Sequence, residues 1–117
     1  MPTPVTVAGA GTIAVARGHQ QAAFLFAVTQ FGRKLDGALV YANLATGDLV
    51  ESLDIDSLTL SGANQATFSG DCFNWEEPCT FTVTVHGNQP VDSFAITGSG
   101  FTPEAGNLTS GAIEISP

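Results

Sequence analysis

The fold is decided by the stretch Gln65-Ala-Thr-Phe-Ser-Gly-Asp-Cys-Phe-Asn-Trp-Glu-Glu-Pro-Cys-Thr-Phe-Thr-Val-Thr-Val-His86. Apolar and polar residues alternate on both sides of a six-residue tip, and a cysteine, Cys72 or Cys79, stands at each shoulder of that tip. Alternate side chains of a strand share a face, so both thiols point to the same side of the predicted hairpin. The stretch therefore predicts a β-hairpin closed by a disulfide.

The two cysteines also predict the register of the hairpin. If Cys72 lies opposite Cys79, the remaining pairs are Gly70 with Phe81, Phe68 with Val83, Ala66 with Val85 and, on the outer face, Thr67 with Thr84. Directly opposed Cβ atoms lie about 4.5–5.5 Å apart, close to the span of a disulfide. We expect an oxidised pair and hence an extracytoplasmic setting, with two reduced, partly buried thiols as the alternative.

The composition describes one acidic domain. The 117 residues are 44% hydrophobic, which provides a core for a single domain over residues 1–117. Three lysines and arginines face eleven carboxylates, and the net charge of -8 argues against nucleic acid and anionic membranes as partners. No segment approaches the roughly 20 apolar residues of a membrane-spanning helix, so no membrane insertion is expected. The start Met1-Pro-Thr-Pro lacks the pattern of a secretory leader, so we expect a secreted protein whose leader is absent from this chain.

Alternation and turn residues recur every eight to twelve positions along the chain, which is typical of all-β folds. We expect an antiparallel β-sandwich or flattened barrel of about nine strands. The expected strands cover residues 5–8 and 12–16 with a bend at Gly9 and Gly11 between them, then 22–31, 38–43, 49–55, 58–60, 65–72, 79–86, 91–97 and 107–115. A corner is expected near Asp56-Ser57, because the inward parity changes from Leu53 and Ile55 to Leu58 and Leu60.

Several segments also match a known pattern in order along the chain. They are Gly11-Thr-Ile, Ala23-Phe-Leu-Phe, Gly37-Ala-Leu-Val-Tyr41, Thr46-Gly-Asp-Leu-Val-Glu-Ser52, Ile55-Asp-Ser-Leu-Thr-Leu-Ser-Gly62, Ala66-Thr-Phe-Ser-Gly70, Cys79-Thr-Phe-Thr-Val-Thr-Val85, Asp92-Ser-Phe-Ala-Ile96 and Leu108-Thr-Ser-Gly-Ala-Ile. Their order resembles the post-COAP domain, a bacterial extracellular β-domain family associated with choice-of-anchor proteins. The resemblance covers nearly the whole chain and implies a secreted or surface-displayed, non-catalytic β-module. The chain departs from it at His86, where Asp or Glu is common, and in the short turn Gly87-Asn-Gln-Pro90.

Three acidic residues are the candidate metal ligands. Asp54 and Asp56 share a face of a strand about 7 Å apart, and Asp71 is a third carboxylate that can converge on them. Calcium is the candidate cation, but it takes six to eight oxygens and the chain lacks the Asp-x-Asp-x-Asp-Gly series of a calcium loop. A solvated acidic face is the simpler interpretation.

The residues of the hairpin tip are the candidate contact site for a ligand or partner. Trp75 is the only tryptophan, and Phe73, Asn74 and Glu76 surround it on a loop that the disulfide would hold rigid. A sugar ring or a protein could stack on this loop. The alternative is that Trp75 folds back and caps the core, since tryptophan is usually largely buried.

Three functions follow from these observations. The first is a non-catalytic, secreted or cell-surface structural or interaction module. Self-assembly of this module into an oligomer or filament is a separate hypothesis, which would use the terminal strands Val5-Thr-Val and Ala112-Ile-Glu-Ile. The second is a carbohydrate- or ligand-binding module that uses Trp75. An enzyme is the least favoured, because no Gly-x-Ser-x-Gly motif is present, and it would require His19 or His86 to meet a carboxylate and a nucleophile.

Overall fold

A computed structural model of the chain describes residues 4–14, 21–62, 64–87 and 92–116. The described part contains nine strands: β1 (Val5–Ala14), β2 (Gln21–Phe31), β3 (Lys34–Asn43), β4 (Asp48–Ser52), β5 (Ser57–Leu60), β6 (Gln65–Asn74), β7 (Glu77–His86), β8 (Ser93–Ser99) and β9 (Glu104–Ser116). None of the described residues belongs to a helix with the length and apolar character required to cross a membrane.

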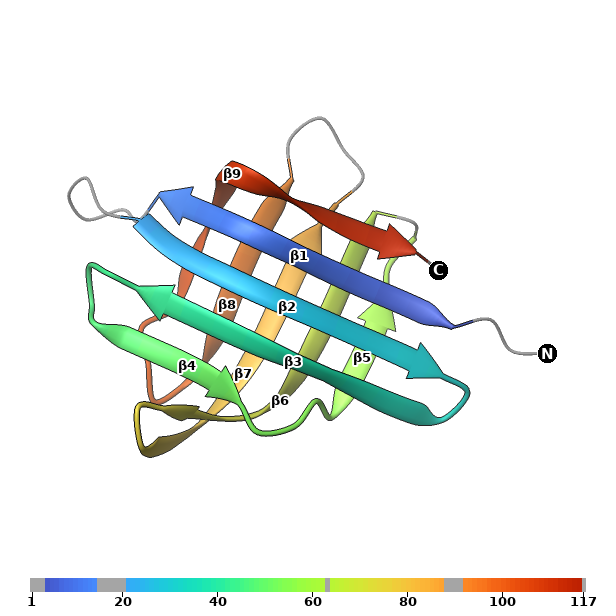
Figure 1. Ribbon diagram of the computed structural model, residues 1–117, viewed down its shortest axis with the longest axis horizontal. Helices are drawn as coiled ribbons and strands as arrows, with labels where there is room; N and C mark the ends of the chain where they lie inside the picture. Colours follow the sequence, from blue (N-terminus) through green and yellow to red (C-terminus); the bar gives the residue numbers. More distant parts are fainter. Residues whose placement is uncertain (1–3, 15–20, 63, 88–91, 117) are drawn as a thin grey trace.

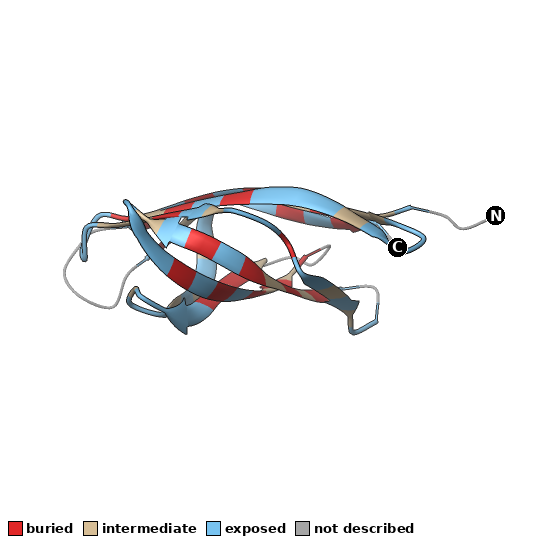
Figure 2. Cartoon of the chain, turned by 90° about the horizontal axis from the view of Figure 1, so that it is seen from below, coloured by how far each residue is buried: buried red, intermediate tan, exposed pale blue. Residues whose placement is uncertain are grey.

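Eight of the strands form a closed antiparallel barrel. Their order is β4-β3-β2-β1-β9-β8-β7-β6, and β4 pairs again with β6 to close the ring, while β5 is an additional strand on β6. Figure 1 shows β1 to β4 crossing in front of β6 to β8, and Figure 2 shows buried and exposed residues alternating along the strands of both layers. With extents of 48 × 34 × 16 Å, the barrel is flattened. The predicted all-β, flattened barrel is confirmed.

The hairpin of β6 and β7 has the predicted register. Cys72 lies opposite Cys79 at a Cα–Cα distance of 4.9 Å, and the two form a disulfide. The other predicted pairs, from Gly70 with Phe81 to Thr67 with Thr84, are also observed. The tip is tighter than expected, because the strands continue to Asn74 and Glu77. The turn therefore consists of two residues rather than six.

The predicted corner lies slightly earlier than expected, over residues 53–56 between β4 and β5. The two strands share one edge of β6, with Ser52 paired to Cys72 and Ser57 paired to Ser69. Gly70 allows this, because a Cβ atom on it would lie 2.1 Å from the Asp54 carbonyl oxygen. Ile55 enters the core as predicted, but the inward placement of Leu53 is wrong, since its side chain is 64% exposed.

The terminal strands close the barrel instead of offering free edges. β1 lies between β2 and β9, and β9 lies between β1 and β8. The expected bend at Gly9 and Gly11 is absent from β1, and the register shift lies on β9, opposite Thr12 and Ile13. Gly11 and Gly111 face each other where the two backbones approach, and a Cβ atom on Gly111 would lie 2.0 Å from the Ala10 carbonyl oxygen. Self-assembly through these strands would therefore require the barrel to open.

An aromatic core fills the space between the layers. The rings of Phe24 and Phe94 stack at a centroid distance of 4.1 Å, and Phe26 contacts both Phe94 and Phe68. Alternation along β2 places Phe24, Phe26 and Val28 inside, as predicted, and leaves Leu25 outside. The inward residues of the front layer thus pack directly on those of the back layer, which fixes the positions of both surfaces discussed below.

Candidate functional site

Trp75 lies at the tip of the hairpin in an unusual backbone conformation. Its φ of 57° is in the left-handed region, and no other non-glycine residue among those described has a positive φ. The conformation costs about 1–2 kcal/mol for an L-residue. Two hydrogen bonds offset the cost: the Trp75 amide donates to Leu49 O at 3.0 Å, and the indole Nε1 donates to Gly47 O at 2.8 Å. Trp75 is therefore anchored on the β3–β4 turn and on the start of β4.

The side chain of Trp75 does not cap the core. It is 67% exposed, so the alternative in which it folds back into the interior is wrong. Its edge is tied to the protein through Nε1 while much of the ring faces solvent. A fixed, exposed aromatic ring loses little freedom when a ligand or partner binds, and this favours contact.

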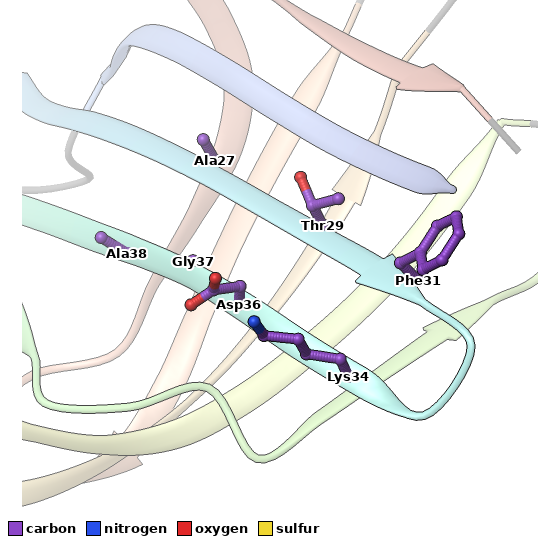
Figure 3. A pocket seen from close by; sticks show the side chains of 7 residues that line it. All are labelled: Ala27, Thr29, Phe31, Lys34, Asp36, Gly37 and Ala38. Atoms are coloured by element: carbon purple, nitrogen blue, oxygen red, sulfur yellow. The ribbon is translucent and has the colours of Figure 1, made fainter. Parts of the chain in front are cut away.

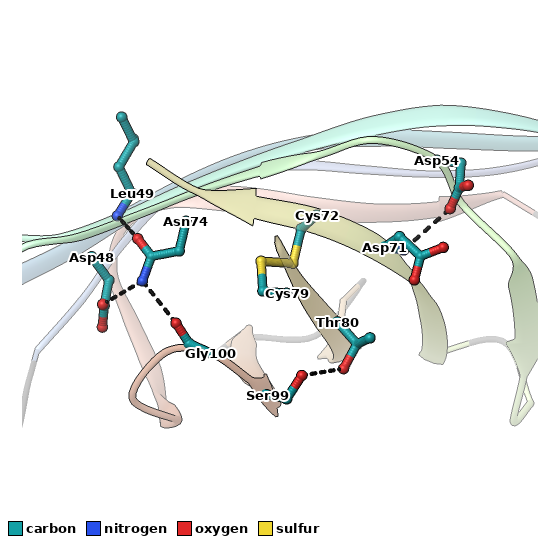
Figure 4. The surroundings of a disulfide bond; sticks show 10 residues. All are labelled: Asp48, Leu49, Asp54, Asp71, Cys72, Asn74, Cys79, Thr80, Ser99 and Gly100. Atoms are coloured by element: carbon teal, nitrogen blue, oxygen red, sulfur yellow. Dashed lines mark hydrogen bonds between the residues drawn. A yellow bond between two sulfur atoms is a disulfide. The ribbon is translucent and has the colours of Figure 1, made fainter. Parts of the chain in front are cut away.

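Asn74 holds the tip in place from the other strand end. Its Oδ1 accepts a hydrogen bond from the Leu49 amide at 3.0 Å, and its Nδ2 donates to Asp48 Oδ1 at 2.8 Å and to Gly100 O at 2.9 Å (Figure 4). These bonds join the hairpin tip to the β3–β4 turn and to the loop before β9. Asn74 was predicted as a contact residue, and its observed bonds give it a positioning role.

Asp48 is the anionic centre of this arrangement. Partial burial alone would raise the pKa of its carboxyl, but hydrogen bonds donated by Thr46, Thr102 and Asn74 outweigh burial and lower that pKa. The carboxylate is thus kept charged at neutral pH. Because several donors from separate loops converge on it, Asp48 ties together the end of the barrel that carries Trp75.

Exposed apolar side chains and hollows surround the tip. One hollow of about 340 Å³ is lined by Phe73, Trp75 and Glu76 together with Glu51 and Ser52. A second, of about 270 Å³, lies against Trp75 and Leu44, and a third, of about 390 Å³, against Phe73 and Leu53. We call the four exposed residues Leu44, Leu53, Phe73 and Trp75 the apolar rim. Three of the predicted contact residues, Phe73, Trp75 and Glu76, therefore line one hollow.

The three candidate metal ligands do come together. Carboxylate oxygens of Asp54, Asp56 and Asp71 lie within 4.8 Å of one another at the corner, and all three residues are exposed. Asp54 Oδ1 accepts a hydrogen bond from the Asp71 amide at 3.1 Å (Figure 4). Desolvation, followed by the charges of Asp54 and Asp71, raises the pKa of Asp56. Exposed acidic groups are common without an ion, so this cluster alone assigns no cation.

His86, the one histidine within the described ranges, gives no further site. His86 Nδ1 lies 3.1 Å from Ser93 Oγ, a contact that follows from their direct cross-strand pairing in β7 and β8. His19 lies outside the described residues. The serine–histidine contact thus has a structural explanation in the register of the sheet.

A second apolar surface, not predicted from the sequence, lies on the outer side of β2 and β3. Leu25 is 61% exposed there, Val40 is exposed directly opposite it, and Phe31 is exposed at the far end of β2. A shallow hollow of about 580 Å³ lies over Ala27, Thr29, Gly37 and Ala38, with Phe31, Lys34 and Asp36 at its margin (Figure 3). A signal was present: in β2 the residues between Phe24, Phe26 and Val28 are also apolar, so both faces of this strand lack charge.

Comparison with known proteins adds no assignment. No family model, curated protein or solved structure matches this chain. Membership of the post-COAP family therefore stays a prediction. The features of this chain that indicate a function are the two exposed apolar surfaces and the barrel that positions them.

Proposed function

We propose that this chain is a non-catalytic interaction module of a secreted or cell-surface protein. The supporting observation is that, among the described residues, the large exposed apolar side chains are gathered rather than scattered. Leu44, Leu53, Phe73 and Trp75 form the apolar rim, while the other three, Leu25, Phe31 and Val40, lie on the outer side of β2 and β3. Single exposed apolar residues are normal on a protein surface, but contiguous apolar patches mark sites of association.

The disulfide supports the extracytoplasmic part of the proposal. Cys72 and Cys79 are both buried and bonded to each other, and disulfides persist mainly in oxidising compartments. This location agrees with what the resemblance to the post-COAP domain implies. A bacterial surface protein is the parent that this resemblance favours.

The net charge restricts the partner. At -8, the chain repels nucleic acid and anionic lipid surfaces at long range, so a neutral or basic protein, a neutral glycan or an uncharged protein face fits better. The apolar surfaces then provide the short-range attraction. The proposed module therefore recognises its partner by apolar and aromatic contact rather than by ion pairs.

A second candidate function is binding of a glycan or another small ligand at the rim. It is favoured by the geometry of Trp75: one hydrogen bond fixes its exposed ring and another fixes its backbone, and the ring lines two hollows. Aromatic rings that need no reorganisation stack well on the apolar faces of sugar rings. Asp48, Glu51 and Glu76 would then provide acceptors for hydroxyl groups at the margins of these hollows.

Two measurements on the same preparation test the proposal. Light scattering on a sizing column measures self-association, and fluorescence during titration with a panel of neutral glycans and basic peptides reports on Trp75 alone, because the chain has one tryptophan. We expect self-association, a fluorescence shift, or both. Leu44→Ala should weaken binding at the rim, and Thr59→Ala serves as an exposed control on β5, away from it. A monomer whose spectrum is unchanged across the whole panel would contradict the proposal.

A further inference from the structure

The outer side of the front layer is a regular apolar surface. In the observed register its residues form three rows across β3, β2 and β1: Ala42, Ala23 and Thr12; Val40, Leu25 and Ala10; Ala38, Ala27 and Ala8. We call these nine residues the outer face. Eight of the nine are apolar (six alanines, Leu25 and Val40), and the ninth is Thr12. Such a composition is expected for a sheet covered by another layer, and here no part of the described chain covers it.

Charge is confined to the margins of the outer face. Glu51 on β4 continues the row of Val40, and Glu114 on β9 continues the row of Ala8. Asp36 and Lys34 lie beyond Ala38, at the start of β3. The chain has eleven carboxylates, yet none occupies the nine central positions. An apolar centre with a charged margin is the usual organisation of a protein–protein interface.

The relief of the face is self-complementary. Leu25 and Val40 lie directly opposite each other and form a ridge. The next row along the strands is Ala27 and Ala38, which line the hollow of about 580 Å³ (Figure 3). Ridge and hollow are therefore adjacent rows about 7 Å apart. A two-fold axis in the plane of the interface, running between these rows, sets the ridge of each copy over the hollow of the other.

We infer that the outer face binds a second copy of this chain and forms a two-fold symmetric, face-to-face dimer. The inference rests on the proposed interaction function and names one partner for it. The contact is isologous, since the same ridge and hollow are used by both copies. Two sheets packed in this way would lie about 10 Å apart, with small alanine side chains allowing close approach.

The outer face together with its charged margins on β4 and β9 has the size of a reversible interface. Strands lie about 4.8 Å apart and residues rise about 3.3 Å, so the surface from β4 to β9 over seven residues of β3 has a projected area of about 550 Å². A standard interface buries about 800 Å² per partner, and weaker ones bury less. The accessible area exceeds the projected area because the ridge stands above the alanines. We therefore expect a dissociation constant in the micromolar range.

Sedimentation equilibrium of the whole chain tests the inference. The wild type is measured from about 1 µM to about 500 µM, a range that spans the expected dissociation constant. Leu25→Glu places a charge in the centre of the ridge and should raise the dissociation constant at least about thirtyfold. Val40→Lys is a second variant with the same expected effect and the opposite charge. Leu44→Glu is the matched control, since Leu44 is 72% exposed and lies in the apolar rim.

Salt dependence gives an independent measure. Two copies that each carry a net charge of -8 repel at long range, and salt screens this repulsion. Because the contact itself is apolar, higher salt should strengthen the wild-type dimer. Weakening by salt would indicate that ion pairs hold the copies together, which contradicts the inference.

Each outcome is decisive for one of the two proposals. A dimer that Leu25→Glu and Val40→Lys dissociate and Leu44→Glu leaves intact supports the inference. A wild type that is monomeric at every concentration overturns it, while the interaction function is still judged by the Trp75 titration. A dimer dissociated only by Leu44→Glu also overturns it, because association would then use the rim. Circular dichroism of each variant verifies that the barrel is folded.

Discussion

Removal of the disulfide is the perturbation whose effect follows most directly from the hairpin. Cys72 and Cys79 are separated by 7 positions and lie opposite each other with buried side chains. In the chain-entropy model, a closed loop of about 8 residues restricts the unfolded chain by an amount worth about 2.5 kcal/mol at 25 °C. Reduction should therefore lower the free energy of unfolding by about that much.

The expected change in melting temperature follows from the size of the chain. Unfolding entropy is about 2.1 cal/mol/K per residue, so for this chain a loss of about 2.5 kcal/mol lowers Tm by about 10 °C. Far-UV circular dichroism before melting should be unchanged, because β6 remains paired with β7, β5 and β4. Thermal melts of the oxidised and reduced wild type measure the cross-link alone.

The Cys72→Ala/Cys79→Ala variant is the matched control. It should melt at or slightly below the reduced wild type, because it also loses the packing of two buried sulfur atoms, and a reductant should not change its Tm further. A reduced wild type that melts within about 2 °C of the oxidised form would refute the reasoning. It would mean that residual hairpin structure already restricts the unfolded chain when the disulfide is absent.

Four further predictions concern the barrel. Gly111→Ala should destabilise the fold by at least about 3 kcal/mol, because the added Cβ would collide with the backbone of β1. Gly62→Ala is the control: Gly62 also has a positive φ but has nothing within 4 Å, so this substitution should cost only about 1 kcal/mol. Urea unfolding of both variants distinguishes backbone collision from φ strain. Asn43→Ala should cost about 2–3 kcal/mol in the same assay, since it removes the acceptor of two backbone amides at a buried site. Burial, with help from nearby carboxylates, raises the pKa of Tyr41 to about 12, so folding favours the neutral phenol. The contribution of Tyr41 to the free energy of unfolding should be constant below about pH 10 and fall as the pH rises toward 12, and Tyr41→Phe should lose this alkaline dependence. Asp56→Asn should raise Tm slightly by relieving repulsion at the acidic corner, and a lowered Tm would show that this carboxylate has a partner that stabilises it.

Local patterns predicted much of the fold because their physical basis is local. The cysteines fixed the register of β6 and β7, and alternation identified Phe24 and Phe26 as inward residues. The change of parity after Leu53 located a corner, although Leu53 itself points outward. A strand pattern reports which residues share a face, and it says nothing of which strand will lie beside it. For this reason the pairing of β4 with β6 and of β1 with β9 could not be predicted.

In the candidate sites, too, some features could be predicted from local sequence and others depended on contacts between distant segments. Asp54, Asp56 and Asp71 do converge, which the sequence offered only as a condition for a cation site, because the corner folds back on the hairpin next to them. The predicted length of the tip, six residues, was wrong, because a two-residue turn here requires a positive φ at Trp75. A bulky residue rarely adopts this conformation, and the hydrogen bond of its indole to the β3–β4 turn stabilises it here. The outer face was not predicted, because alanine occurs at both buried and exposed strand positions and so does not mark an apolar face in an alternating pattern. Only the cross-strand register shows that these alanines form one surface.

The most direct test of the central claim is a dilution series of ¹⁵N–¹H spectra of the uniformly labelled wild type. The series compares amide shifts at concentrations above and below the dimer dissociation constant. We predict concentration-dependent shifts of Leu25, Ala27, Ala38 and Val40, with unchanged shifts at Trp75 and Glu76. Spectra that do not change on dilution, or changes confined to the hairpin tip, would contradict association through the outer face.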